Sequence, residues 1–230
     1  MEPTLSGEPN IVGTGFCAEF TEIVVTCWHV AKERSKLANM ALAKLNKQSL
    51  AEGQRFRVGV RTSDGSYVWF EPVKGTSMYF DHPEYDVCDY RLAGLPPLRL
   101  RAAPHVVQGD DVGVLGFPMG NRLQGQSIRP FVAKTVTSGV YEGEDKSKII
   151  GPKIAIAESV AGGYSGGPIF SARGGEVVGM LSSTMFEQGQ WPAGISLGIA
   201  STTVRQFVFD AQAESAITIQ RALTSRSSSK

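Results

Sequence analysis

The chain carries a serine inside a glycine-rich turn, and this turn follows every histidine in the sequence. The turn covers residues 163–168, with the sequence GYSGGP. The histidines of the chain are His29, His82 and His105. Glycines in the turn let the backbone bend sharply enough for the amides of Gly163 and Ser165 to point at one anionic oxygen. His29 closes a strand-like apolar run, so the two features together predict a serine nucleophile with a histidine base.

The order of these residues excludes two folds that carry the same chemistry. Residues 163–167 also match the G-x-S-x-G pattern of α/β-hydrolases, but in that fold the histidine follows the serine. The subtilisin order places an aspartate before the histidine, whereas the first aspartate of this chain is Asp64. With His29 as the base, only the order histidine, aspartate, serine remains, which is the order found in chymotrypsin.

The aspartate of this order must lie between His29 and Ser165. The candidates are Asp64, Asp81, Asp86, Asp89, Asp110, Asp111 and Asp145. Asp86 is favoured because it opens a strand-like segment, where a carboxylate can be held rigidly beneath an imidazole. Asp89 is the alternative in the same strand, but its odd offset from Asp86 places it on the opposite face. We therefore expect His29, Asp86 and Ser165 to form a catalytic triad, with the Gly163 and Ser165 amides as its oxyanion hole.

Several segments occur in an order that is specific when they are taken together. They are 13–16 (GTGF), 25–30 (VTCWHV), 86–92 (DVCDYRL), 163–168 (GYSGGP), 175–179 (GEVVG) and 194–204 (GISLGIASTTV). In this order they resemble the trypsin-like serine peptidases, and within them the HtrA-type branch more than the digestive enzymes. Short β-type runs separated by turn residues also indicate barrels rather than a parallel sheet. The resemblance implies an all-β fold of two antiparallel six-stranded barrels with the triad at their junction.

The same resemblance implies how the chain is divided. Residues 1–210 would form a single protease unit, and no PDZ-like segment is expected after it. The N-terminal barrel, the C-terminal barrel and the remaining tail would cover residues 11–103, 104–210 and 211–230. Residues 31–50 have apolar side chains at helical spacing, which predicts a helical insertion directly after the catalytic histidine. The tail would contain the end of a C-terminal helix followed by a disordered segment.

The resemblance places the primary substrate pocket on two further segments. Its residues would be Ser159, Val160, Ser182, Ser183, Thr184 and Gly194. Ser159 matches the pocket-floor position, which is acidic in enzymes with trypsin-like specificity. A medium-sized apolar substrate side chain is therefore expected rather than arginine or lysine. Tyr164 stands where digestive enzymes carry the aspartate that receives a freshly cleaved amino terminus, so we expect an enzyme that is constitutively mature or activated by a partner protein.

Composition argues against several other classes of protein. The net charge is +1, from 23 basic and 22 acidic residues, so no field that attracts nucleic acid or membrane surfaces is expected. No apolar run approaches the roughly 20 residues of a membrane span, and the amino terminus does not resemble a secretion signal. No histidine has metal-ligand spacing, and no cofactor is expected. The odd number of cysteines, 3, in apolar contexts favours reduced thiols and a cytoplasmic location.

Two other functions remain compatible with the sequence. The fold could serve as a catalytically silent peptide-binding or scaffold module, with Tyr164 distorting the nucleophile loop. A viral polyprotein-processing protease would also lack secretion signals and disulfides. Cys27 and Cys88 flank two proposed catalytic residues, which leaves a redox-sensitive site open. The function favoured by the sequence is nevertheless hydrolysis of peptide bonds in a protein or peptide substrate through an acyl-enzyme.

Overall fold

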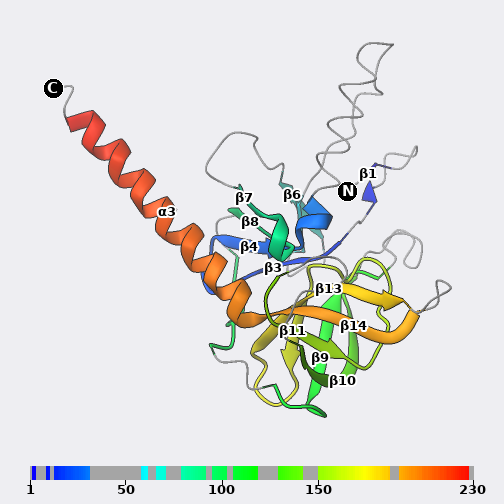
Figure 1. Cartoon of the computed structure of the whole chain (residues 1–230). Coiled ribbons are helices and arrows are strands. Elements are labelled where there is room, and N and C mark those ends of the chain that lie inside the picture. Colours follow the sequence, from blue (N-terminus) through cyan, green and yellow to red (C-terminus); the bar gives the residue numbers. More distant parts are fainter. Residues whose placement is uncertain are drawn as a thin grey trace.

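The structure is a computed structural model, and it describes both β-rich halves of the chain and the helix that follows them (Figure 1). The described residues are 2–3, 9–10, 13–31, 58–61, 66–70, 79–91, 95–102, 106–118, 129–141, 150–186 and 192–227. The predicted helical insertion falls almost entirely on residues 32–50, which lie outside them. The last part of the predicted tail, residues 228–230, lies outside them as well.

The C-terminal half forms a closed antiparallel barrel in the strand order β10-β11-β14-β13-β12-β9. Its strands are β9 (Asp111–Gly116), β10 (Phe131–Tyr141), β11 (Lys153–Ile156), β12 (Pro168–Ser171), β13 (Val177–Phe186) and β14 (Pro192–Ala200). Alternate side chains of these strands, among them Val114, Ile154 and Ile169, fill the barrel interior. The six-stranded C-terminal barrel predicted from the sequence is therefore confirmed.

The N-terminal half contains a four-stranded antiparallel sheet in the order β3-β4-β8-β7. Its strands are β3 (Gly15–Cys17), β4 (Ile23–Thr26), β7 (Tyr79–His82) and β8 (Val87–Arg91), and the short helix η1 (Pro83–Tyr85) joins β7 to β8. Two further antiparallel pairs are β5 (Val58–Arg61) with β6 (Tyr67–Phe70) and β1 (Glu2–Pro3) with β2 (Pro9–Asn10). A second closed barrel stays a prediction.

Strand β4 shows why this sheet is stable, because apolar side chains cover both of its faces. Ile23 and Val25 belong to a core that includes residues of the C-terminal helix. Val24, which points the other way, packs in a separate cluster with Cys88 and Tyr90. A run of β-branched residues suits a strand that is buried on both sides. This rigid strand leads directly into the segment that carries His29.

The C-terminal helix α3 (Ser201–Ser227) follows β14 without a loop. Val204, Phe207, Val208 and Ala211 are buried against the N-terminal sheet and the end of the barrel. Figure 1 shows that the first turns of α3 lie beside the two sheets and that its later part extends away from both. Within the described ranges, no helix has the length and apolar character needed to cross a bilayer. The first turns of the helix thus fasten the two halves of the molecule together.

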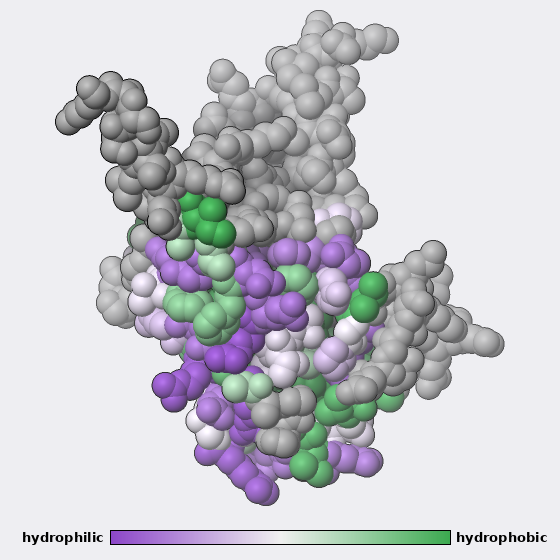
Figure 2. Space-filling model, turned by 60° about the vertical axis from the view of Figure 1, so that its left-hand side comes forward, coloured by the Kyte–Doolittle hydropathy of each residue, from purple (hydrophilic) through white to green (hydrophobic). Residues whose placement is uncertain are grey.

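Among the described residues, exposed large apolar side chains occur on several elements, and the largest group lies on β10. Four of the exposed large apolar residues lie on β10, namely Phe131, Val132, Val136 and Val140. On the face shown in Figure 2, green apolar patches are separated by purple hydrophilic surface. Scattered exposed apolar residues are ordinary for a folded protein and do not by themselves mark a binding site.

Candidate active site

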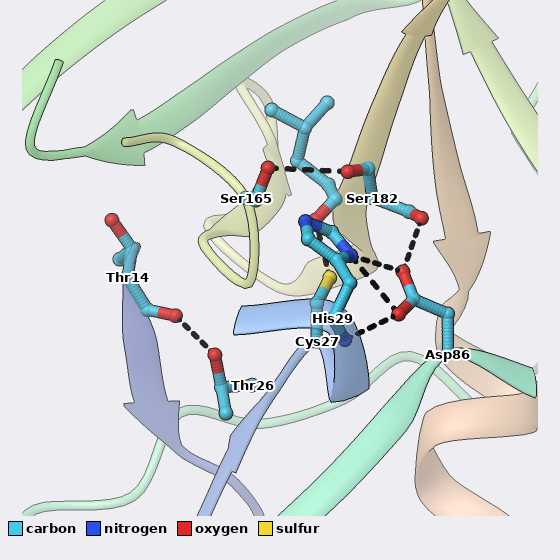
Figure 3. Close-up of polar contacts among 8 residues, drawn as sticks. Thr14, Thr26, Cys27, His29, Asp86, Ser165 and Ser182 are labelled. Atoms are coloured by element: carbon cyan, nitrogen blue, oxygen red, sulfur yellow. Dashed lines mark hydrogen bonds and ion pairs between the residues drawn. The ribbon is translucent and has the colours of Figure 1, made fainter. Parts of the chain in front are cut away.

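His29 and Asp86 form a close, well-oriented pair between β4 and β8 (Figure 3). The Nδ1 atom of His29 lies 3.0 Å from Oδ1 and 2.9 Å from Oδ2 of Asp86. The backbone amide of His29 also donates to Oδ1, over 2.9 Å. The Asp86 side chain is 4% exposed and the His29 side chain is 44% exposed. The carboxylate therefore fixes the ring from the protein side and leaves the other ring nitrogen free to face a substrate.

The local backbone explains why Asp86 can reach the imidazole. Asp86 lies between η1 and β8 and adopts a left-handed conformation, with φ of 54°. Aspartate tolerates this conformation better than most residues, although it remains strained. The Asp86 carbonyl accepts a hydrogen bond of 3.1 Å from the Trp28 amide, which opens a helical turn containing His29. The strained backbone of Asp86 is thus held by a hydrogen bond from the helical turn that contains His29.

The electrostatics of the pair keep the Asp86 carboxyl ionised. Burial alone would raise its pKa, but hydrogen bonding and the nearby charge of His29, together with the Ser182 hydroxyl, hold that pKa below its ordinary value. The Ser182 Oγ atom donates to Asp86 Oδ2 over 2.6 Å, and both residues are buried. An ionised carboxylate at Nδ1 keeps the proton of a neutral imidazole on that atom, which leaves Nε2 as a proton acceptor.

The loop that carries Ser165 is fastened to the N-terminal half by Thr14. The amide of Thr14 donates to the Ser165 carbonyl over 2.8 Å, and its hydroxyl donates to the Gly163 carbonyl over 2.6 Å. Thr26 in turn donates its hydroxyl to the Thr14 carbonyl over 2.6 Å. The Thr14–Gly163 contact joins residues 149 positions apart, whereas the Thr26–Thr14 contact joins residues 12 positions apart. These contacts hold the serine loop and the histidine strand in one arrangement.

Glycine at position 166 is required by this close approach. Gly166 has φ of +84°, and a Cβ atom there would lie 2.1 Å from the Thr14 carbonyl oxygen and 2.3 Å from Thr26 Oγ1. The Gly166 amide donates to the Leu181 carbonyl over 2.8 Å, which secures the same turn to β13. The glycine therefore allows two backbones to meet directly behind Ser165.

The Ser165 hydroxyl is oriented toward β13. Its Oγ atom donates to the Ser182 carbonyl over 3.2 Å (Figure 3). Among the described residues, no hydrogen bond joins Ser165 to His29. Catalytic hydrogen bonds are often absent or long before substrate binds, and a rotation about one torsion changes the direction of a serine hydroxyl. The structure thus brings the three predicted residues close together through Ser182, with the serine hydroxyl bonded to the Ser182 carbonyl rather than to His29.

The predicted oxyanion hole lies in the same turn. Gly163 has φ of +102°, which turns the backbone ahead of the serine. In the part of the chain that the structure describes, the amides of Gly163 and Ser165 donate no hydrogen bond, whereas the following Gly166 and Gly167 amides are both used. Backbone amides without a partner in the protein are the feature that anion binding requires.

The predicted pocket residues lie on the segment before the serine loop and on β13 and β14. The Ser159 hydroxyl accepts a hydrogen bond from the Gly194 amide over 3.1 Å, and the Val160 amide donates to Ser196 over 3.2 Å. Gly194 has φ of +73° and open space where a side chain would stand. Ser183 is half-buried, whereas the side chain of Thr184 lies outside the described set. These contacts bring the two predicted walls together.

Two residues, Ser182 and Cys27, make contacts in the site that the sequence did not predict. Ser182 was expected as a pocket wall, but its hydroxyl contacts Asp86 and its carbonyl contacts Ser165. Cys27 is fully buried beneath the pair, and its thiol donates to the Leu181 carbonyl over 3.1 Å. Burial and the neighbouring Asp86 carboxylate raise the pKa of this thiol well above its ordinary value, so it is neutral. The sequence contained only one signal for Cys27, its position two residues before His29.

Asp89, the alternative aspartate, faces away from His29. It is 1% exposed, and its carboxylate oxygens make no hydrogen bond, with His82 Nε2 at 4.0 Å from Oδ2. Desolvation, followed by the negative charge of Asp210 on α3, raises the pKa of Asp89 to about 7. Its strand partner Val25 belongs to the core beneath α3, so Asp89 points into that core. Asp86 is the aspartate that contacts the imidazole.

Comparison with known families is consistent with this geometry. The family model of the trypsin-like peptidase domain matches residues 13–180, a span that contains His29, Asp86 and Ser165. The chain belongs to the trypsin-like peptidase family. No individually curated protein sequence is significantly similar to it.

Solved structures show the same fold. The HtrA-type protease AlgW with a tripeptide is 18% identical to this chain, with a TM-score of 0.60, and the match covers 86% of this chain and 55% of that chain. AlgW with a decapeptide is 17% identical, with a TM-score of 0.58, and the match covers 86% of this chain and 52% of that chain. The chain therefore spans about half the length of these proteins. At this identity the likeness shows a shared serine-protease fold.

Proposed function

We propose that the chain is a serine endopeptidase that cleaves peptide bonds through an acyl-enzyme. The observation that carries the proposal is the pairing of His29 Nδ1 with the buried Asp86 carboxylate at 2.9–3.0 Å, with the Ser165 loop fastened to the adjoining β3 by Thr14. An exposed imidazole on a buried carboxylate, next to a serine in a glycine turn, is the arrangement required for nucleophilic catalysis.

The mechanism follows from these contacts. On substrate binding, the Ser165 hydroxyl rotates from the Ser182 carbonyl toward Nε2 of His29. The serine oxygen attacks the scissile carbonyl while Nε2 takes its proton, and the resulting imidazolium later gives the proton to the leaving amine. Asp86 keeps the Nδ1 proton in place and stabilises the imidazolium. Water then hydrolyses the ester by the reverse sequence of proton transfers.

The anionic oxygen of the tetrahedral intermediate would be bound by the amides of Gly163 and Ser165. Each such donor contributes about 3 kcal/mol to stabilisation of the transition state in enzymes of this type. The free amides of the turn support this assignment. No cofactor is required by the mechanism, because the nucleophile, base and oxyanion donors all belong to the chain.

The proposed substrate pocket keeps the residues that the sequence predicts except Ser182, whose hydroxyl contacts Asp86. We propose that Ser159, Val160, Ser183 and Thr184 line it, that Gly194 leaves its base open, and that it accepts a medium-sized apolar side chain. Tyr164 is buried in the barrel core and packs against the backbone of Gly116. An apolar ring in this place supports an enzyme that does not depend on zymogen cleavage. AlgW, whose fold this chain shares, was solved with peptides, which supports a peptide substrate.

The proposal also covers the second barrel, the cellular compartment and the mode of activation. We propose that β5 and β6 join the four-stranded sheet to complete the second six-stranded barrel, since together they supply the required number of strands. Cys17, Cys27 and Cys88 are buried cysteines outside any disulfide, which suits a reducing compartment such as the cytoplasm. The chain would be constitutively mature or activated by a protein partner, as the sequence predicts.

The test is cleavage of a diverse peptide library, read by mass spectrometry, by the wild-type chain and by Ser165→Ala. We expect cleavage after medium-sized apolar residues, and a loss of about a millionfold in turnover with Ser165→Ala. Cleavage confined to arginine and lysine would refute the pocket assignment. Binding of peptides without cleavage by the folded wild type would favour the scaffold alternative. Specific cleavage of the chain's own junctions would favour a polyprotein-processing enzyme.

A further inference from the structure

Cys27 lies against the proposed catalytic pair although the mechanism gives it no role. Its sulfur, a ring nitrogen of His29 and a carboxylate oxygen of Asp86 all lie within 4.8 Å of one another (Figure 3). The three residues come from the end of β4, the helical turn after it and the start of β8. A thiolate, an imidazole and a carboxylate are the ligands that zinc and related thiophilic cations bind in proteins.

Small movements would bring these atoms, which lie within 4.8 Å of one another, to the spacing of a tetrahedral metal site. With metal–ligand bonds of about 2.0–2.3 Å, neighbouring ligand atoms of such a site lie roughly 3.3–3.6 Å apart. The Nδ1 and carboxylate atoms would separate slightly from their present 2.9–3.0 Å, and the sulfur would move inward. His29 can make this adjustment because its side chain is 44% exposed.

We propose that Cys27, His29 and Asp86 form an inhibitory binding site for a thiophilic divalent cation of the zinc and cadmium type. Thiolate and carboxylate together carry two negative charges, so a divalent cation would be neutralised at a site where two of the three ligands are buried. Hard cations such as magnesium prefer oxygen ligands and would not compete for the sulfur.

Binding would change the protonation of the histidine in a defined way. The cation displaces the thiol proton of Cys27 to solvent and takes the Nδ1 lone pair of His29. The proton that Nδ1 shares with Asp86 in the free protein moves to Nε2, so that the imidazole stays neutral. Nε2 is then a donor and cannot accept the proton of Ser165. The cation therefore removes the general base without occupying the substrate pocket.

Binding and inhibition can be tested separately, because only inhibition rests on the proposed peptidase function. Cadmium is the probe, since a cadmium–thiolate bond has a characteristic ultraviolet charge-transfer absorption. We expect this absorption in the wild type and in Ser165→Ala, which needs no catalysis. We expect this absorption to be absent in Cys27→Ala. In His29→Ala we expect the affinity for cadmium to be at least about a hundredfold weaker than in the wild type. Cys17→Ala, which removes another buried thiol, should retain it.

The site would be overturned by three results. These are the absence of cadmium–thiolate absorption in the folded wild type, its persistence in Cys27→Ala, or its indifference to His29→Ala. Circular dichroism of each variant establishes that the chain is folded, and Cys27→Ser provides a second, polar replacement in case the alanine variant unfolds.

Inhibition is then measured as the fraction of each variant's own metal-free peptidase rate that remains with cadmium or zinc. We expect near-complete loss in the wild type and in Cys17→Ala, reversed by a chelator, and at least a tenfold higher inhibitory concentration in Cys27→Ala. Equal sensitivity of Cys27→Ala and the wild type would overturn inhibition through this site. If the wild type shows no peptidase activity at all, the proposed function fails while the absorption experiment still decides the binding site.

Discussion

Replacement of Ser182 by alanine removes the hydrogen bond between the Ser182 hydroxyl and the Asp86 carboxylate, and so measures its contribution to stability. The Ser182 hydroxyl donates to Asp86 Oδ2 over 2.6 Å at a site where both residues are buried. A hydrogen bond to a charged group contributes about 1.5–3 kcal/mol. Its loss should therefore raise the pKa of Asp86, because the Ser182 hydroxyl stabilises the ionised carboxylate.

The sign of the pH dependence follows from the direction of this shift. The pKa of Asp86 is lowered in the folded protein, so the stabilisation is present above the pKa of the unfolded chain and is lost as pH falls through the folded value. Ser182→Ala should therefore lower the free energy of unfolding by about 1.5–3 kcal/mol near pH 7. The difference from the wild type should shrink toward zero on acidification below about pH 4.

Urea denaturation at several pH values measures this difference, and Ser183→Ala is the matched control. Ser183 occupies the next position of β13 and has no hydroxyl contact with Asp86 among the described hydrogen bonds. Its replacement should change stability by less than about 0.5 kcal/mol. The reasoning is refuted if Ser182→Ala behaves like Ser183→Ala near neutral pH, or if its effect does not diminish in acid.

Two further predictions concern stability. Asp89 retains its proton in the folded chain up to about pH 7 and loses it near pH 4 in the unfolded chain, so it makes stability fall as pH rises between these values. The stability of Asp89→Asn relative to the wild type should therefore rise over this interval by up to about 4 kcal/mol in urea denaturation, and a constant difference would contradict the assignment. Gly166→Ala should destabilise the chain by more than about 2 kcal/mol in the same assay, because its Cβ would meet the Thr14 backbone at a positive φ. Gly109→Ala is the control, since Gly109 also has positive φ (+89°) but open space around it, and equal effects of the two substitutions would show that the close approach is unimportant.

The sequence could predict the residues of the site because their chemistry restricts their order. His29 and Ser165 belong to short motifs whose local conformation depends on neighbouring glycines and a preceding strand. Asp86 could be chosen over Asp89 because alternation along a strand separates their faces. In the structure Asp86 contacts the imidazole and Asp89 lies beneath α3. Strand periodicity alone does not account for the arrangement, because Asp86 precedes β8 and has φ of 54°.

Contacts that depend on tertiary register could not be predicted. The direction of the Ser182 hydroxyl depends on how β13 aligns with the start of β8, and these segments are 96 residues apart in sequence. The position of Cys27 beneath the pair depends in the same way on the approach of Leu181. The sequence predicted the end of a C-terminal helix within residues 211–230, but not that the helix continues to Ser227.

The central claim is that Ser165 is a nucleophile activated by His29, and labelling with a fluorophosphonate probe tests it most directly. The probe reacts with activated serines, and peptide mass spectrometry locates the labelled residue. We predict labelling of Ser165 in the wild type, none in Ser165→Ala, and a strong reduction in His29→Ala, with all three chains folded by circular dichroism. Absence of labelling in the folded wild type, or labelling that does not depend on His29, would contradict the account.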